Sequence, residues 1–458
     1  MLQSFFRWGA GMLQRFLSHP LLKRVIRNTG YLFSAQTISA ALSMAQGVLA
    51  ARLLGPVGLG NVGLITLFSS NINRLTSFRM SELVVSYVGK YEAREDPIKA
   101  AATFKAAALV EFSGSVLAFI LIIILAPLGA EIFSHDPGLA NLYAFYGLSV
   151  IANLIAESST GLLQYFNRFR WIAFVMVAQS VVTLGLIVFA FVTSGNIVMV
   201  VSAYLIGKII LAMSLTALAI WQARRAWGAG WWRSPLKSLR DDSRDLIRFA
   251  LSTNISGTLN LITRDSDELW LGAFTSPLQA GYYKIAKAIL NVILIPVSPL
   301  IQTTYKEVAT EIANRRWMNV RYLLRSGSLI SAAWTLPAAL GLVVFGRWVV
   351  GLYGLNFLPT SYLCLLIMLV GGIAVNIFYW NRSVLLPLGL PEFPTKVHFV
   401  GALLKVVGIV FLVPQFGALG MSALLSAFFL FSSVVLVSKA LQTIRKAESV
   451  PPPAQGLT

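Results

Sequence analysis

The chain has 458 residues, of which 57% are hydrophobic and 12% are charged. A soluble domain has about 25% charged residues, so this composition excludes a soluble enzyme, a disordered chain and a disulfide scaffold. One cysteine and three histidines cannot make an internal disulfide or a Cys/His zinc cluster. The net charge of +19 would suggest nucleic acid in a soluble protein, but its distribution along this chain points to a membrane.

Apolar segments recur along the chain, each long enough to cross roughly 30 Å of hydrocarbon. We therefore predict an all-α integral membrane protein with about twelve transmembrane helices. The predicted spans are 29–52, 58–88, 101–126, 140–163, 171–193, 197–221, 248–272, 280–305, 322–344, 358–384, 395–413 and 417–438.

The distribution of lysine and arginine predicts the orientation of these spans. Twenty-eight lie in the tails and loops that twelve spans place on one side, and two, Arg52 and Arg347, lie in loops on the other side. Because cytoplasmic loops carry the excess of positive charge, both termini are predicted to be cytoplasmic. The basic character then reflects topology and attraction to anionic lipid, and we expect no nucleic-acid partner.

A long basic loop divides the predicted spans into six and six. We expect an interfacial helix on the cytoplasmic leaflet at 1–24, because its aromatic and aliphatic residues can share one helical face. The remaining predicted parts are a six-helix lobe at 25–221, a basic cytoplasmic linker at 222–247, a second six-helix lobe at 248–440 and a cytoplasmic tail at 441–458.

The two lobes carry a weak internal repeat. Residues 52–65 read RLLGPVGLGNVGLI and residues 269–286 read LWLGAFTSPLQAGYYKIA, and both segments place Leu-Gly, a turn and a further Gly between two spans. The repeat falls between the first and second spans of each lobe. Since six spans are an even number, the two copies would run in the same direction, as a parallel repeat.

Polar residues concentrate in the first two spans of each lobe. Span 2 contains SSNINRLTSFRMSE at 69–82, and span 7 contains STNISGTLN at 252–260 followed by TRDSDE at 263–268. Charged groups are costly in lipid and normally face a bundle interior or a water-filled cavity. We therefore expect spans 1, 2, 7 and 8 to line a polar, net-positive cavity between the lobes.

Catalytic motifs are absent from the sequence. There is no GxxxxGK[ST] loop, no HExxH and no CxxC, and the acidic residues are too scattered for an intramembrane transferase that needs a metal cluster. We expect no enzyme activity, no cofactor and no metal.

Two segments resemble the signatures of a known family. ARLLGPVGLGNVGLI at 51–65 resembles ARxLGPxxxGxY, and TRDSDELWLGAFTSPLQAGYYKIAKAI at 263–289 resembles RxxDxxxxGxxxSxxxxGxYxxA. Both belong to polysaccharide exporters of the O-antigen flippase type, in the superfamily that includes multidrug and toxin extruders and lipid II flippases. The matching positions in the second segment are Arg264, Asp267, Gly272, Ser276, Gly281, Tyr283 and Ala286.

The resemblance implies a function and a location. The substrate would be an oligosaccharide on a polyprenyl pyrophosphate, moved by alternating access from the cytoplasmic to the outer leaflet of a bacterial inner membrane for cell-surface polysaccharide. Membrane lipid and a polysaccharide polymerase are the implied neighbours. The alternatives are a small-molecule or multidrug antiporter of the same superfamily, which the intramembrane cations disfavour, and a non-transporting membrane partner of polysaccharide enzymes.

Arginine suits a pyrophosphate because its charge is permanent and its fork can bind two oxygens. Arg74 is the leading phosphate candidate, since no acid lies three or four residues away in its helix. Arg79 could pair with Glu82 or exchange it for the head group. The candidate substrate-binding residues are Arg74, Arg79, Glu82, Asn254, Asn260, Arg264, Asp267, Lys284 and Lys287.

Two of these predictions have a structural alternative. Asp267 could form an internal salt-bridge cluster with Lys284 or Lys287 instead of binding substrate. Glu111 and Glu157 are candidate coupling sites for H⁺ or Na⁺, or simple partners for Lys208 and Lys405.

Overall fold

The structure, a computed structural model, describes residues 20–77, 80–249 and 261–449. Within these ranges the chain is helical apart from turns and short connections. The helices are α2 (Pro20–Thr76), α3 (Met80–Glu92), α4 (Pro97–Ser134), α5 (Ala140–Ala152), α6 (Ala156–Tyr165), α7 (Phe169–Val192), α8 (Ile197–Trp227), α10 (Asp267–Phe274), α11 (Pro277–Leu294), α12 (Ser298–Ala313), α13 (Trp317–Gly351), α14 (Thr360–Ile377) and α15 (Glu392–Glu448).

The helices agree with an all-α membrane protein. Nine helices in the described residues are long and apolar enough to cross a membrane. Two of them, α2 and α15, each combine two of the predicted spans across a kink, at Gly55 and Gly417. Both glycines have positive φ, 66° and 53°, which a side chain would disfavour. The predicted span 248–272 lies partly outside the described residues.

Several boundaries differ from the sequence prediction. The predicted span 58–88 is interrupted between α2 and α3, within its polar run. The predicted span 140–163 is divided between α5 and α6, where the Asn153 amide donates a hydrogen bond to the Ser149 carbonyl and competes with helical bonding. Helix α8 continues to Trp227 and α15 to Glu448, so the predicted linker and tail both begin as helix. The predicted helix 1–24 falls almost entirely outside the described residues.

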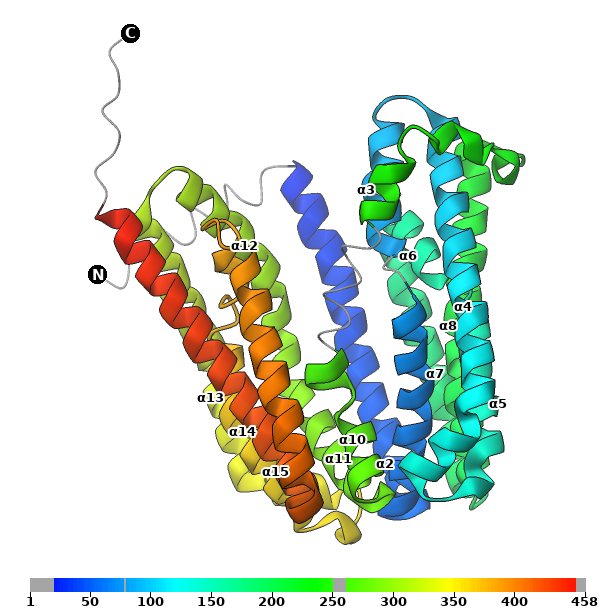
Figure 1. Ribbon diagram of the computed structural model, residues 1–458, viewed down its shortest axis with the longest axis vertical. Coiled ribbons are helices and arrows are strands. Elements are labelled where there is room, and N and C mark those ends of the chain that lie inside the picture. Colours follow the sequence, from blue (N-terminus) through cyan, green and yellow to red (C-terminus); the bar gives the residue numbers. More distant parts are fainter. Residues whose placement is uncertain (1–19, 78–79, 250–260, 450–458) are drawn as a thin grey trace.

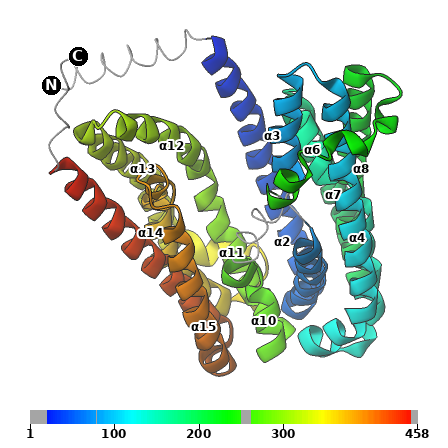
Figure 2. The same cartoon turned by 45° about the horizontal axis from the view of Figure 1, so that its top comes forward.

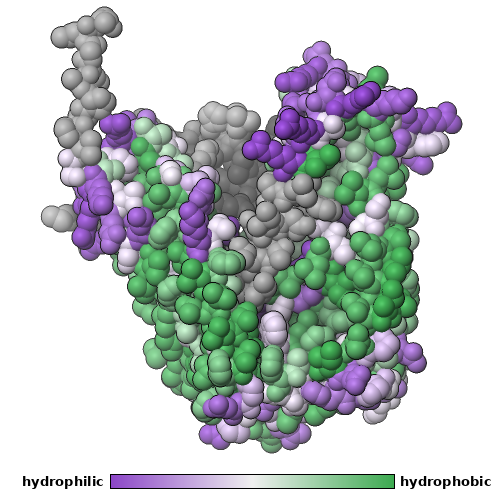
Figure 3. All heavy atoms as spheres, in the orientation of Figure 1, coloured by the Kyte–Doolittle hydropathy of each residue, from purple (hydrophilic) through white to green (hydrophobic). Residues whose placement is uncertain are grey.

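The helices form two groups, which we call the N-lobe (α2–α8) and the C-lobe (α10–α15). The groups meet at one end and diverge toward the other, which carries the start of α2, the end of α15 and the segment after α8 (Figures 1 and 2). We call this the linker end. On the face that Figure 3 shows, hydrophobic side chains form a broad band across the middle of the molecule, with hydrophilic residues at both ends. This is the surface expected of a bilayer-spanning protein.

The lobes are joined at the end opposite the linker by a close crossing of α2 and α11. A Cβ atom at Gly60 would lie 1.8 Å from the Pro277 carbonyl oxygen, and one at Gly281 would lie 2.2 Å from the Pro56 carbonyl oxygen. The two contacts are reciprocal and involve equivalent positions of the sequence repeat. We call this contact the glycine crossing. It requires glycine at both positions because each backbone touches the other directly.

Two hydrogen bonds reinforce the joined end. Arg52 of α2 donates from Nε to the Leu352 carbonyl at 2.7 Å. His135, which ends α4 in the left-handed conformation, places Nε2 2.8 Å from the Gly272 carbonyl of α10. Each contact joins an N-lobe residue to a C-lobe backbone carbonyl, so two hydrogen bonds to backbone acceptors accompany the glycine crossing.

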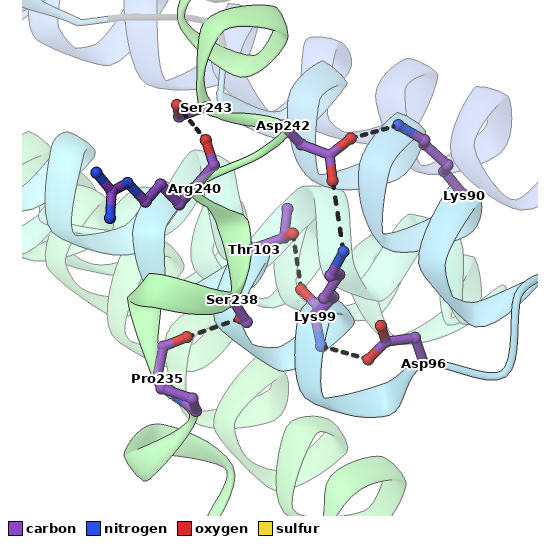
Figure 4. Close-up of polar contacts among 9 residues, drawn as sticks. All are labelled: Lys90, Asp96, Lys99, Thr103, Pro235, Ser238, Arg240, Asp242 and Ser243. Carbon is purple, nitrogen blue, oxygen red and sulfur yellow. Dashed lines mark hydrogen bonds and ion pairs between the residues drawn. The ribbon is translucent and has the colours of Figure 1, made fainter.

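The linker is attached to the N-lobe. The Asp242 carboxylate accepts a hydrogen bond from Lys90 of α3 at 3.0 Å and lies 3.7 Å from the ammonium group of Lys99 of α4 (Figure 4). The bond from Lys90 holds the pKa of Asp242 below its usual value. Lys105 also donates to the Ser234 carbonyl at 3.2 Å. These contacts tie the described part of the linker to the N-lobe.

The arrangement of the helices predicts which loops are accessible from each side of the membrane. With the linker end in the cytoplasm, cysteine at Asn196 or Ser276 should react with an impermeant reagent added outside intact cells, and cysteine at Ser238 should not. The native Cys364 is buried and gives no background. Reaction of Ser238→Cys from outside would contradict this orientation.

The glycine crossing predicts that alanine at either of its two glycines lowers the stability of the protein, whereas alanine at a glycine outside the crossing does not. Gly60→Ala or Gly281→Ala should force α2 and α11 apart and lower the melting temperature of the purified protein, at a cost of about 1–3 kcal/mol or more. Gly185→Ala in α7 is the matched control, because a Cβ atom there meets no heavy atom within 4 Å. Equal melting temperatures for all three variants would show that the crossing does not hold the lobes together.

Candidate functional site

The charged residues of the membrane region gather where the C-lobe segment η4 (Leu261–Asp265) and helices α10 and α11 meet α2. This seam between the lobes contains most of the described residues that the sequence singled out. Charges are stable here because each can face a partner or the space between the lobes instead of lipid.

An ion pair joins the lobes across this seam. Arg74, at the end of α2, donates from Nη1 to the carboxylate of Asp265 in η4. The side chains keep 53% and 36% of their accessible surface, so the pair remains open to solvent. Lys208 of α8 acts electrostatically on the same region, and Asn71 donates to the Ser266 hydroxyl at 3.0 Å. Arg74 is therefore unpaired within its own helix, as predicted, but is neutralised by the other lobe.

A second pair is buried inside the C-lobe. The ammonium group of Lys405 in α15 lies 2.6 Å from the Asp267 carboxylate, with exposed side-chain fractions of 2% and 0%. The Tyr283 hydroxyl also donates to Asp267. The predicted partners of Asp267, Lys284 and Lys287, are not the ones that it contacts. The distant residue Lys405 reaches it because α15 packs against α10.

The two lysines of α11 have other neighbours. A Cβ atom at Gly63 of α2 would lie 2.9 Å from both the Glu268 carboxylate and the Lys284 ammonium group, so these opposite charges lie against the same point of the N-lobe. Lys287 donates to the Arg264 carbonyl at 2.7 Å. Lys284 thus borders the seam, and Lys287 supports the backbone of η4.

Glu111, a predicted ion-coupling residue, is hydrogen-bonded to the start of α6. Its carboxylate accepts hydrogen bonds from the backbone amides of Glu157 and Ser158, at 2.7 and 2.8 Å, and from the Ser158 hydroxyl at 2.6 Å. These groups form the first turn of α6, where negative charge is favoured. Glu111 therefore caps α6, and Lys405, a suggested partner, is bonded to Asp267 instead.

Three of the predicted site residues, Arg79, Asn254 and Asn260, lie outside the described residues. Glu82 is in the first turn of α3. Among the described residues, no group of three or more His, Cys, Asp or Glu side chains could hold a metal ion.

A cavity of about 250 Å³ lies between the lobes. Ser43 and Gly47 of α2 line its N-lobe side, and Lys284 and Asn291 of α11 line its C-lobe side, with Tyr204 of α8 beside them. Spans 1, 2 and 8 of the sequence prediction thus contribute to one interlobe cavity.

A larger cavity of about 550 Å³ lies inside the C-lobe. It is lined by η4, α12, the segment that contains η7 (Ser383–Leu385), and both halves of α15. Its polar and aromatic lining includes Arg264, Asp265, Tyr305, Tyr379, Asn381, Arg382, His398, Phe428, Phe429 and Ser432. We call this the C-lobe pocket.

Sequence reasoning did not single out most of this pocket. Arg382 is one of the twenty-eight basic residues of the tails and loops, and no motif in the sequence includes His398. Their spans carry few polar residues, so local polarity gave no signal. The only local clue is the cluster Tyr379, Asn381 and Arg382 at the end of an otherwise apolar span.

The fold and the charged seam define a class of protein. A multidrug resistance transporter of the MATE family and the MOP superfamily, solved in an inward-facing conformation, superposes with a TM-score of 0.75 at 14% identity, over 90% of this chain and 96% of that chain. The lipid II flippase MurJ, in an inward closed conformation, superposes with a TM-score of 0.70 at 16% identity, over 91% of this chain and 90% of that chain. A MOP superfamily transporter from Pyrococcus furiosus superposes with a TM-score of 0.59 at 12% identity, over 93% of this chain and 97% of that chain. The chain has the fold of MOP superfamily transporters.

The sequence match gives the family itself. Residues 25–305 match the family described as polysaccharide biosynthesis protein, and the chain belongs to that family. No curated protein matches the chain in sequence. A polysaccharide biosynthesis family with the fold of MOP transporters is in keeping with the expectation that the chain has no enzyme activity.

The buried pair predicts a large effect of removing one partner. Lys405→Met or Asp267→Ala should lower the free energy of unfolding by about 3–5 kcal/mol, because each breaks a buried ion pair by removing one of its partners. The double variant Lys405→Met/Asp267→Asn should recover much of the loss. Melting temperatures in detergent report both effects.

A surface pair provides the matched control for this prediction. Lys396 lies 2.9 Å from Glu392, with exposed fractions of 72% and 79%, and exposed pairs contribute about 0–1 kcal/mol. Lys396→Met should therefore be nearly neutral. If Lys405→Met is equally mild, the buried pair has no structural role.

Proposed function

We propose that the protein is a flippase for polyprenyl-pyrophosphate-linked oligosaccharide, which it moves from the cytoplasmic to the outer leaflet for cell-surface polysaccharide synthesis. The observation that carries this proposal is the set of cationic side chains, Arg74, Lys208 and Lys284, that border the seam between two lobes of a transporter fold, in a chain of the polysaccharide biosynthesis family. A pyrophosphate cannot cross hydrocarbon unaided, and fixed cations offset its charge in a poorly solvated site.

The proposed cycle follows from where the lobes touch. The glycine crossing and its two flanking hydrogen bonds close one end, and the lobes diverge at the linker end. With that end in the cytoplasm, substrate would enter between the lobes, and rocking of the lobes would open the other end. The polyprenyl tail would stay in lipid while the head group crosses along the seam.

In this cycle we assign the ion pair Arg74–Asp265 the role of a reversible contact between the lobes. The pair links the lobes only while they are close at this point, so opening and closing must break and reform it. Its accessible surface leaves it free to exchange partners with water or substrate. This differs from the prediction that Arg74 is a free cation that awaits a phosphate.

The proposed function is tested by deleting the gene in the source organism. The lipid-linked oligosaccharide should accumulate on the cytoplasmic side and the surface polysaccharide should be lost, since its precursor cannot cross. Re-expression of the wild-type chain or of the Gly185→Ala control should restore both. An unchanged distribution of the lipid-linked intermediate would exclude the flippase.

The second candidate is a small-molecule antiporter, which the superposition on a MATE transporter with a TM-score of 0.75 favours. The cations Arg74, Lys208 and Lys284 along the seam oppose cationic drugs as cargo. Faster drug accumulation in the deletion strain, with normal surface polysaccharide, would support the antiporter instead.

A charge exchange tests the role of the seam pair. Arg74→Asp and Asp265→Arg should each impair polysaccharide export, because each places like charges across the seam, and the double variant should recover most of it. If Arg74 binds phosphate, as the sequence alone suggests, the double variant stays inactive at normal protein level. The exposed pair Glu392→Lys/Lys396→Glu is the control and should leave export unchanged throughout.

A further inference from the structure

We propose that the C-lobe pocket is the binding site for the pyrophosphate of the substrate, with Arg264 and Arg382 as its two cationic contacts. This assignment rests on the proposed flippase function. It moves the phosphate site from Arg74 to a pocket of the C-lobe that adjoins the seam.

The first argument concerns charge. The pocket is lined by two guanidinium groups, Arg264 and Arg382, and by one carboxylate, Asp265. That carboxylate is already bonded to Arg74. Among the described residues, neither Arg264 nor Arg382 has a carboxylate within ion-pair distance. The pocket therefore keeps an excess of two positive charges, which a pyrophosphate would balance.

The second argument concerns convergence. Arg264 comes from η4 and Arg382 from the turn before η7, yet both act electrostatically on the imidazole of His398 in α15. The Arg264 guanidinium lies 5.1 Å from the centre of the Phe429 ring, a cation–π contact that orients it. Two guanidinium groups that line one pocket and reach the same neighbour can bind one anion together, and their forks match the oxygens of a diphosphate.

The third argument concerns the remaining lining. Asn381 is 8% exposed, and its amide nitrogen donates to Ser433 at 3.3 Å, which leaves its oxygen as an acceptor. The Tyr379 hydroxyl is paired with Thr304 at 2.7 Å, so its ring is fixed. Amides and fixed aromatic rings beside a phosphate site suit the first sugar of a glycosyl pyrophosphate. The volume of about 550 Å³ admits such a group.

The pocket also adjoins the seam. Asp265 lines the pocket and pairs with Arg74 of the N-lobe, so an anion bound at Arg264 lies one residue from the interlobe pair. The anion would compete with Asp265 for the nearby cations and weaken the pair. Binding in the C-lobe pocket would in this way favour separation of the lobes at the seam.

The test is binding of glycan-free polyprenyl pyrophosphate to the purified full-length protein in detergent. Arg382→Ala and Arg264→Ala should each weaken binding by roughly 10- to 100-fold, the loss expected for one charge-assisted contact, and Arg382→Lys should weaken it less. Inorganic pyrophosphate should compete for the site. Phosphatidylglycerol, with one phosphate charge, should compete far less.

The control is Arg325→Ala, in a separate cavity between α13 and α15, which should bind as the wild type does. Melting temperatures establish that each variant is folded, and Arg382→Gln replaces Arg382→Ala if the latter is not. Unchanged binding by both arginine variants would overturn the pocket while leaving the flippase intact. Equal competition by phosphatidylglycerol, or loss of affinity in Arg74→Ala alone, would overturn it too.

If the wild-type protein does not bind polyprenyl pyrophosphate, the pocket assignment is also overturned. The flippase itself is judged separately, by the lipid-linked intermediate in the deletion strain.

Discussion

Direct backbone contact between α2 and α11 is the constraint on which the rest of the structure depends. At Gly60 and Gly281 no side chain separates the helices, and each approaches the other's carbonyl oxygen. This contact joins the lobes at one end of the molecule. Because both helices are long and diverge from it, the space between the lobes widens toward the linker end, and the seam charges lie along that space.

The charges follow from the same geometry. An ionised group in lipid is costly, so each must find a partner or an aqueous surface. Asp267 and Lys405 pair inside the C-lobe, where both are fully enclosed, and such a pair fixes which faces of α10 and α15 meet. Arg74 and Asp265 pair between the lobes and stay accessible. The buried pair therefore stabilises one lobe, and the accessible pair can respond to movement between the two.

The linker is attached to the N-lobe, and this attachment determines which lobe it moves with. Asp242 ties it to α3 and α4 of the N-lobe through Lys90 and Lys99 (Figure 4). The described part of the linker will therefore move with the N-lobe when the two lobes move relative to each other.

The sequence by itself determined the features that depend on local composition. Apolar length predicted a helical membrane protein, and the charge bias predicted one side for the linker and both termini. The repeat of Leu-Gly, a turn and a further Gly predicted equivalent positions in the two lobes. The sequence also identified Arg74, Asp267 and Lys284 as unusual, because a charge in an apolar span is visible without a structure.

Only the tertiary structure decided the partners of these charges. Lys405 meets Asp267 across 138 positions of sequence, and Asp265 meets Arg74 across 191, distances over which local spacing carries no information. The C-lobe pocket likewise depends on contacts between residues that are far apart in the sequence. Arg382 and His398 lie in unremarkable sequence, and they acquire a shared environment with Arg264 because the kinked α15 folds back against η4 and α14.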